Sequence, residues 1–247
     1  MQTILSVEHL SVSYPSGDIR EVGLKEYLFR RLRGDGKVER APAVKDVSFS
    51  LSRGELLGII GGNGAGKSTL LKAVSGVLKP SVGRVMRHGV QATLLELGSG
   101  FDGDLSVWEN VFLRGALLGY TRDFMKRMAP EILKFAELEG VRERQFKHLS
   151  SGMRSRLAFS IASLVEPDLL ILDEVLAVGD GAFRQKSEER MRRVIASGTA
   201  TVLVSHSLRE LRELATKILW LSHGECVYYG EDVKGALAEY EGGMKKK

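Results

Sequence analysis

A glycine-rich segment constrains the fold of this 247-residue chain more than any other feature of its sequence. The segment reads Gly61-Gly62-Asn63-Gly64-Ala65-Gly66-Lys67-Ser68-Thr69 and matches the pattern G-x-x-x-x-G-K-[ST]. A short apolar run over 55–60 precedes it, and a helical pattern over 68–77 follows it. Glycines let the backbone wrap closely around phosphate oxygens, and the start of a helix adds partial positive charge. The segment therefore predicts a phosphate-binding loop between a buried strand and a helix.

Two side chains of this loop can act on bound phosphate groups. The ammonium group of Lys67 can reach β- and γ-phosphates, and the Ser68 hydroxyl can ligate Mg²⁺. From average residue frequencies, the pattern arises by chance in about 1% of chains of this length. The predicted nucleotide-binding residues of the loop are Gly61, Asn63, Gly64, Ala65, Gly66, Lys67, Ser68 and Thr69.

A second apolar run ends in two acidic residues, Asp173 and Glu174. Alone, such a pair more often lies in a solvated turn. Because parallel strands bring their carboxyl ends to one edge of a sheet, however, Asp173 can lie close to Ser68 and help to hold Mg²⁺. Glu174 points the other way from its neighbour and can polarise an attacking water. A metal that neutralises charge and a carboxylate that positions the nucleophile are the requirements of phosphoryl transfer.

The rest of the chain alternates short apolar runs with helical patterns, which predicts an α/β domain. From Ser106 to about Val165 the patterns are all helical, with a capping box at Ser106 and Glu109 and expected breaks at Pro130 and Gly140. The expected strands are 4–14, 44–51, 55–60, 91–97, 169–172 and 201–204. A basic amphipathic helix is expected over 19–33, a hairpin over 217–229 turning at His223-Gly224, and a last helix near 233–240.

Composition narrows the class of protein without choosing a partner. No uncharged apolar run approaches the roughly 18 residues that a membrane-spanning helix needs. The start of the chain lacks the basic and apolar regions of a secretory signal, and Cys226 is the only cysteine, which fits a reducing compartment. The net charge of +5 suits an anionic partner such as nucleic acid, a lipid leaflet or nucleotide phosphate, or no particular partner.

Four motifs in order, with a helical stretch after the first, carry a resemblance to a known family. The phosphate loop, the helical stretch, Leu149-Ser150-Ser151-Gly152-Met153, the strand ending in Asp173-Glu174, and His206 after a further strand resemble the ATP-binding subunit of ABC transporters. The resemblance covers essentially the whole chain. It implies the nucleotide-binding fold of that family: a RecA-like mixed sheet core with an antiparallel β subdomain and an inserted α-helical subdomain. It also implies ATP and Mg²⁺ as ligands.

The resemblance assigns roles to further residues. Ser150, Ser151 and Gly152 bind the γ-phosphate of ATP held by a second copy of the chain, so that two chains close head to tail over two ATP molecules. His206 contacts the γ-phosphate and steadies Glu174 and the water. Tyr14 stands where the family stacks an aromatic ring on adenine, although packing is the competing interpretation.

Several departures from the common family pattern point to a subfamily. Glu96 replaces the usual lid glutamine and is predicted to ligate Mg²⁺ or the water, or to report to the membrane subunit. The segments Leu94–Phe101, Ser150–Met153 and Asp173–Asp180 together resemble exporters of cell-surface polysaccharides, which move lipid-linked O-antigen or teichoic-acid polymers. Some members carry a further carbohydrate-binding domain, and we expect none within residues 1–247.

The resemblance also organises the chain into regions. We expect one ATPase domain over 1–247, with the catalytic core and β subdomain in 1–97 and 166–247, a helical subdomain in 98–165 and an amphipathic insertion in 17–43. The insertion suits a membrane surface, a pyrophosphate-linked lipid or the chain's own domain. The helical subdomain is expected to grip a coupling helix of the membrane subunit, with Phe101, Leu105 and Trp108 as candidate lining residues.

The sequence therefore predicts an ATP-hydrolysing motor for polysaccharide export. Its expected partners are a second copy of itself and a polytopic membrane subunit, two copies of each, at the cytoplasmic face of the inner membrane. Two alternatives stay open: an exporter of another substrate, such as capsule polymer or a drug, and a soluble ABC-type ATPase acting on nucleic acid or ribosomes. The single phosphate loop and the lack of sustained heptads count against the last, so no nucleic-acid partner is expected.

Overall fold

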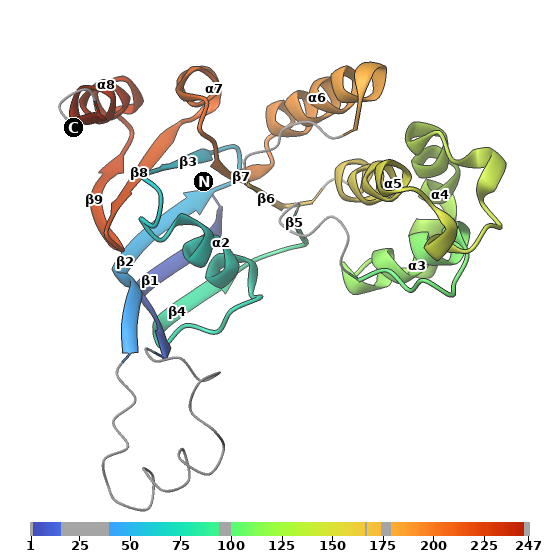
Figure 1. Cartoon of the computed structure of the whole chain (residues 1–247), viewed down its shortest axis with the longest axis horizontal. Coiled ribbons are helices and arrows are strands. Elements are labelled where there is room, and N and C mark those ends of the chain that lie inside the picture. Colours follow the sequence, from blue (N-terminus) through green and yellow to red (C-terminus); the bar gives the residue numbers. More distant parts are fainter. Residues whose placement is uncertain (1, 16–39, 94–99, 166, 174–178, 245–247) are drawn as a thin grey trace, which may run out of the picture.

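The computed structural model describes residues 2–15, 40–93, 100–165, 167–173 and 179–244. Figure 1 shows two sheets joined by a central helix, with a group of helices standing to one side. The amphipathic helix expected over 19–33, the end of the strand expected over 91–97, and the residues Glu96 and Glu174 lie outside the described residues.

The larger sheet has six strands in the order β5-β6-β7-β3-β8-β9. All neighbouring pairs are parallel except β8 and β9. The strands are β3 (Leu56–Ile60), β5 (Gln91–Thr93), β6 (Leu169–Asp173), β7 (Ala200–Val204), β8 (Lys217–Ser222) and β9 (Glu225–Gly230). In β3 and β7 every residue is buried, as is expected of apolar runs covered on both faces of a sheet.

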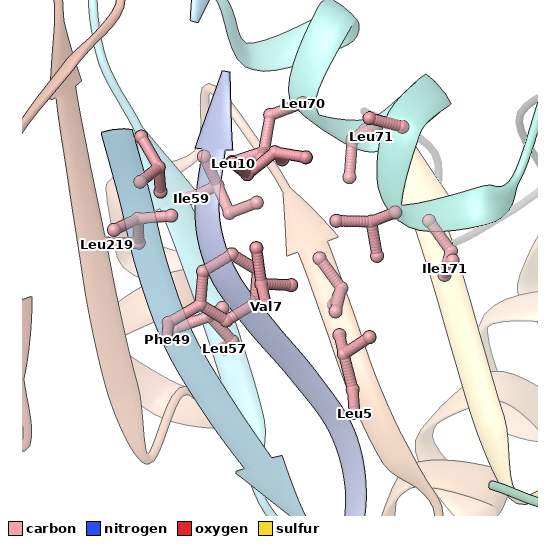
Figure 2. Packing of buried hydrophobic residues seen from close by; sticks show 14 of the residues in the cluster. Leu5, Val7, Leu10, Phe49, Leu57, Ile59, Leu70, Leu71, Ile171 and Leu219 are labelled. Atoms are coloured by element: carbon pink, nitrogen blue, oxygen red, sulfur yellow. The ribbon is translucent and has the colours of Figure 1, made fainter. Parts of the chain in front are cut away.

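The smaller sheet is antiparallel and has the order β2-β1-β4. Its strands are β1 (Thr3–Pro15), β2 (Arg40–Ser52) and β4 (Val82–Arg87). Helix α2 (Lys67–Ser75) packs between the two sheets, and its Leu70 and Leu71 join one buried cluster with Leu10 and Ile59 (Figure 2). This cluster fixes the direction in which α2 leaves β3, and hence the shape of the loop between them.

The second face of the large sheet is covered by α6 (Gly181–Ala196), α7 (Leu208–Leu214) and α8 (Val233–Met244). Alternate residues of the same strands divide between the two faces: Leu57 and Ile59 join the cluster around α2, whereas Leu56 and Ile60 join the second cluster. The predicted hairpin turn is confirmed. Its two loop residues, His223 and Gly224, have φ values of 50° and 83°, as a type I′ turn requires.

A separate helical region comprises α3 (Val107–Leu117), α4 (Arg122–Ala136) and α5 (Ser151–Leu164), with two short 3₁₀ turns at Glu139–Val141 and Phe146–His148. It has a hydrophobic cluster of its own. The predicted capping box at the start of α3 is present, because Ser106 accepts the Glu109 N–H and Glu109 accepts the Ser106 N–H. No described helix is long and apolar enough to span a membrane.

The predicted break at Pro130 is wrong, because Pro130 lies inside α4. A proline in a helix interior removes one N–H donor and costs about 3 kcal/mol. The side chains that α4 buries outweigh this cost, since each buried aliphatic side chain contributes about 1.5–3 kcal/mol. The buried residues are Met125, Ala129, Ile132, Leu133 and Ala136. Gly140 does follow the helix end, because α4 stops at Glu137, which adopts a left-handed φ of 61°.

Candidate functional site

The glycine-rich loop leaves the end of β3 and enters α2, as its motif predicts. Gly61 and Gly66 have φ values of 151° and 101°, and a Cβ atom on either would collide with a backbone carbonyl, that of Leu221 or of Ala43. Only glycine therefore fits at these two positions without a shift of the backbone. Around Gly62, by contrast, no described atom lies within 4 Å of the position that a Cβ would take. The backbone at that position is open to a ligand.

Positive charge converges on this open backbone. The Lys67 ammonium group lies across the loop and donates to the carbonyl oxygens of Gly61 at 2.7 Å and Gly62 at 3.0 Å. Helix α2 begins at Lys67 with Gly66 as its N-cap, which has no side chain to accept the first N–H groups, and its first turn has no acidic residue. A cation, a helix N-terminus and an exposed backbone together form a site for a polyphosphate.

The residues after β6 and β7 lie at the same edge of the sheet as this loop. In the register, Asp173 is opposite Val204 of β7, and Val204 is opposite Ile59 of β3. Because neighbouring strands are about 4.8 Å apart, the Cα atoms of Asp173 and Ile59 are about 10 Å apart. Asp173 is half-buried, and the exposed His206 comes two residues after Val204. The topology thus gathers the loop, a carboxylate and a histidine at one edge.

Tyr14 lies beside the loop as well. It is at the end of β1, is 41% exposed, and its hydroxyl oxygen is 3.4 Å from the Thr69 Oγ1 in the first turn of α2. An exposed aromatic ring next to a phosphate site can stack on a planar base.

The segment around Ser150 forms the start of α5. Ser150 is the N-cap, and its Oγ accepts the Met153 N–H at 3.2 Å, while Leu149 is buried and anchors the turn. Ser151 and Gly152 are exposed, and a Cβ atom on Gly152 would meet no described atom within 4 Å. Figure 1 shows α5 among the side helices, away from α2. A single chain therefore does not bring this helix start to its own phosphate loop.

The structure shows two hollows, of which the sequence analysis did not anticipate the first. One of about 380 Å³ lies beside the phosphate loop, lined by Asn63 and Ala65 on one side and by Trp220 and Tyr240 on the other. The two aromatic rings meet edge to face with centroids 5.4 Å apart. Trp220 is in β8 and Tyr240 in α8, so no local pattern pairs them.

The second hollow is a groove of about 620 Å³ between α3 and α4. Its lining residues are Trp108, Glu109, Phe112, Leu113, Ala116, Tyr120, Arg122, Met125 and Lys126. Of the three lining residues expected from the sequence, Trp108 is present. Phe101 and Leu105 are not among them. Phe101 instead stacks on Phe146, with the ring centroids 4.5 Å apart. The Arg114 guanidinium lies over the Phe101 ring, 5.3 Å from its centroid, so Phe101 is a packing residue.

Comparisons with known proteins agree with this geometry. Residues 44–177 match the family model described as "ABC transporter". The chain is 37% identical over 225 residues to the O-antigen export system ATP-binding protein RfbB of Klebsiella pneumoniae, covering 90% of this chain and 92% of that protein. It is 34% identical over 245 residues to the teichoic acids export ATP-binding protein TagH of Staphylococcus epidermidis, covering 99% and 90% of the two chains.

A solved structure shares the fold. It is the dimeric structure of a post-hydrolysis state of the ATP-binding cassette MJ0796 bound to ADP and Pi. The TM-score is 0.66 with 21% sequence identity, over 92% of this chain and 98% of that one. The predicted architecture, a mixed sheet with an antiparallel sheet and inserted helices, is confirmed.

Proposed function

This chain belongs to the ABC transporter family, and from that premise we propose that it is the ATP-hydrolysing subunit of an exporter of lipid-linked cell-surface polysaccharide. Membership makes the chain an ABC-type ATPase. The observation that supports the mechanism is the gathering of the phosphate loop, Asp173 and His206 at one sheet edge. The choice of an O-antigen or teichoic-acid polymer is supported by relatives that align with nine tenths or more of the chain.

The loop fits the phosphates of ATP. The open backbone at Gly62 gives room for close approach, and the uncapped start of α2 supplies N–H donors. Lys67 exchanges its two carbonyl partners for phosphate oxygens and stabilises the charge that develops on the γ-phosphate. Tyr14, next to Thr69, stacks on the adenine. The remaining loop residues, Gly61, Asn63, Gly64, Ala65 and Gly66, shape the cradle.

The metal and the water have donors at the same edge. Mg²⁺, when bound, neutralises charge on the phosphates. Ser68, at the start of α2, and Asp173, at the end of β6, offer the oxygen ligands that Mg²⁺ prefers, and Glu96 is a further candidate. Glu174, the residue after Asp173, polarises the attacking water, and His206 orients it.

A second copy of the chain completes each site. The start of α5 exposes Ser151 and Gly152 but stands away from the phosphate loop of its own chain. In a head-to-tail pair, Ser150, Ser151 and Gly152 of one chain cover the γ-phosphate held by the other. The solved structure that shares the fold is dimeric and binds ADP and Pi, which supports a pair of chains. ATP then favours the closed pair, and hydrolysis reopens it.

The groove between α3 and α4 is the proposed contact with the membrane subunit. Trp108 and Phe112 meet edge to face at 5.2 Å in its wall, so it offers an aromatic surface to an amphipathic helix. We place the chain at the cytoplasmic face of the membrane as a peripheral subunit, held there by two copies of a polytopic partner. The amphipathic insertion over 17–43 is proposed as a further contact with the membrane surface or the lipid-linked substrate. The helical subdomain over 98–165 and the core over 1–97 and 166–247 are the proposed moving parts.

The export function is tested by capture from native membranes. Tagged Glu174→Gln chain with ATP and Mg²⁺ is recovered from detergent-solubilised membranes, and copurifying proteins are identified by mass spectrometry. A polytopic membrane protein in about equal amount is expected, and a Trp108→Ala control in the groove between α3 and α4 should recover less of it. Recovery with ribosomes or nucleic acid, or from the soluble fraction alone, would overturn the export function. A strain lacking the chain is expected to accumulate the lipid-linked polymer inside.

A further inference from the structure

The hollow of about 380 Å³ beside the phosphate loop is lined by segments that lie far apart in the chain. Loop residues form one wall, the end of β8 with its turn forms the second, and α8 forms the third. Strand β8 neighbours β3 on the side opposite β7, so the hollow lies across β3 from Asp173 and His206. We call it the Trp220 hollow, and its polar lining residues are Asn63, Trp220, Ser222, His223 and Tyr240.

The polar side chains of this lining have no hydrogen-bond partners of their own. Among the residues that the structure describes, none of the five polar lining side chains makes a hydrogen bond. They offer an amide, an indole N–H, an imidazole and two hydroxyl groups. Trp220, Ser222 and Tyr240 are half-buried, so a ligand in the hollow can shield them from water. A hollow of this size with a few convergent polar groups is typical of a small-ligand site.

The charge of the lining restricts the ligand. In the described part of the chain, the Trp220 hollow is lined by no Lys, Arg, Asp or Glu. A phosphate or carboxylate ligand would lose hydration there without a cation to compensate. A purely apolar ligand would cover the five polar groups and leave them without partners. The lining therefore favours an uncharged ligand that carries several hydrogen-bonding groups.

The geometry of the two aromatic rings restricts the ligand further. The rings of Trp220 and Tyr240 have centroids 5.4 Å apart and an interplanar angle of 77°. Two nearly perpendicular rings form a corner, whereas a flat heterocycle stacks best in a parallel slot. A sugar ring has C–H groups on its faces and hydroxyl groups around its rim. It can therefore contact both aromatic rings while its hydroxyls pair with Ser222 and His223, whose side chains can each donate and accept.

The walls of the Trp220 hollow are attached to the phosphate loop. The Gly224 N–H, in the turn after β8, donates to the Ala65 carbonyl oxygen in the loop at 3.0 Å. The Gly224 carbonyl oxygen accepts the Lys45 N–H at 2.8 Å, which fixes the turn on β2 as well. Asn63 lines the hollow and belongs to the loop itself. A ligand in the hollow therefore bears on the shape of the loop.

We propose that the Trp220 hollow binds an uncharged sugar ring and that the bound ring strengthens ATP binding at the adjoining phosphate loop. The ring bridges α8 and the loop, and so holds the loop in the shape that receives phosphate. By linkage, ATP strengthens sugar binding by the same factor. That the sugar is a unit of the exported polymer rests on the proposed export function, whereas the binding itself rests on the hollow.

The emission of Trp220 reports on the hollow directly. The chain has two tryptophans, so Trp108→Phe leaves Trp220 as the only one. Methyl glycosides of glucose, galactose, mannose and N-acetylglucosamine are added in turn to the purified chain. For at least one of them we expect a saturable change with a Kd on the order of 1–10 mM, as for a ligand of about a dozen heavy atoms.

Two further probes test the class of ligand. Glucose 6-phosphate carries charge, and uracil is a flat ring without hydroxyl groups, so neither is expected to give a saturable change. If none of the four glycosides saturates, the sugar site is wrong. If glucose 6-phosphate or uracil binds as tightly as the best glycoside, the proposed ligand class is wrong.

Variants that remove single hydroxyl groups locate the binding. Tyr240→Phe keeps the ring against Trp220, and Ser222→Ala is a small change in a half-buried side chain. Each is expected to weaken glycoside binding about 3- to 10-fold, the loss of one hydrogen bond, with the urea midpoint unchanged. The matched control is Tyr229→Phe on β9, whose hydroxyl donates to the Ser50 carbonyl oxygen at 2.6 Å and does not line the hollow. An equal loss in this control would overturn the site.

The link to ATP is measured with a fluorescent ATP analogue. With saturating glycoside, the Kd of the analogue is expected to fall about fivefold, and the reverse titration should give the same factor. An unchanged Kd would mean that the hollow does not act on the loop. These titrations use the purified chain without membranes, so their failure leaves the export function standing. Capture with ribosomes in place of a membrane protein would instead overturn export and leave the sugar site standing.

Discussion

Two helix starts in this molecule carry glycine and bind phosphate in the proposed mechanism, yet they are built in opposite ways. The start of α2 is enclosed: Gly61 and Gly66 press against carbonyls of neighbouring strands, and Lys67 folds over the loop. The start of α5 is open: the Ser150 side chain caps the helix, and no described atom lies within 4 Å of the Cβ position of Gly152. The first is a complete cradle within one chain, whereas the second offers a surface that a partner must complete.

The largest expected effect removes the charge from the enclosed start. Lys67→Ala deletes the only side chain seen to lie across the loop among the described residues, so kcat is expected to fall on the order of 10²- to 10³-fold. ATP binding to the monomer should be lost as well. A phosphate-release assay and analogue binding measure the two. If binding persists at wild-type affinity, the positive charge at this loop is supplied by another group.

Gly66 at the start of α2 is closely packed, whereas Gly152 at the start of α5 is not, and Gly66→Ala tests the first half of this difference. Its φ of 101° is costly for any residue with a Cβ, by about 1–2 kcal/mol, and the collision with the Ala43 carbonyl adds to that cost. The free energy of unfolding is therefore expected to fall by more than about 2 kcal/mol. Urea unfolding monitored by tryptophan fluorescence gives the value. A smaller loss would mean that the loop relaxes away from β2.

Gly152→Ala makes the same change at the open start, with the opposite expected sign. Its φ is not in the left-handed region, and the added methyl meets open space, so the substitution is expected to stabilise the chain by about 0.4–1 kcal/mol. ATP-driven dimerisation in the Glu174→Gln background is nevertheless expected to weaken, because the methyl group stands where the partner's phosphate approaches. A fall in stability, or unchanged dimerisation, would remove the distinction between the two starts.

The sequence predicted the structural elements around the enclosed helix start because their determinants are local. The loop motif, the apolar β3 and β6, the capping box at Ser106 and the turn at His223-Gly224 each depend on a few consecutive residues. By contrast, β4 was missed, because its residues are exposed or half-buried and its partner β1 lies far back in the chain. Local rules also failed at Pro130, where burial of one face of α4 overrides the propensity of a single residue.

Contacts between residues far apart in the chain could not be predicted, because the patterns used depend on consecutive residues. Arg156 and Asp180 are 24 positions apart, and nothing in either local pattern indicates that α5 and α6 meet at that point. The Trp220–Tyr240 contact beside the loop is similar. The motif that contains Ser150 was recognised, but only the structure shows that this segment stands away from its own phosphate loop. Its need for a second chain thus gains a geometric argument that the spacing of motifs does not provide.

The smallest expected effect is the pH dependence of the stability that the Arg156–Asp180 ion pair contributes between α5 and α6. The hydrogen bond from Arg156 holds the pKa of Asp180 below its ordinary value of 3.8, so the ion pair contributes stability above that value. The contribution is lost as pH falls through the lowered pKa, where the folded state must also protonate the carboxylate.

Asp180→Asn removes this contribution of the ion pair at every pH. The difference in unfolding free energy between wild type and Asp180→Asn is therefore expected to be constant from pH 7 to about pH 5 and to shrink below about pH 4. Urea titrations across this range measure it. The control is Glu188→Gln, which breaks the Arg192–Glu188 pair within α6. A difference that stays constant or grows in acid would mean that the Arg156 guanidinium does not hold Asp180.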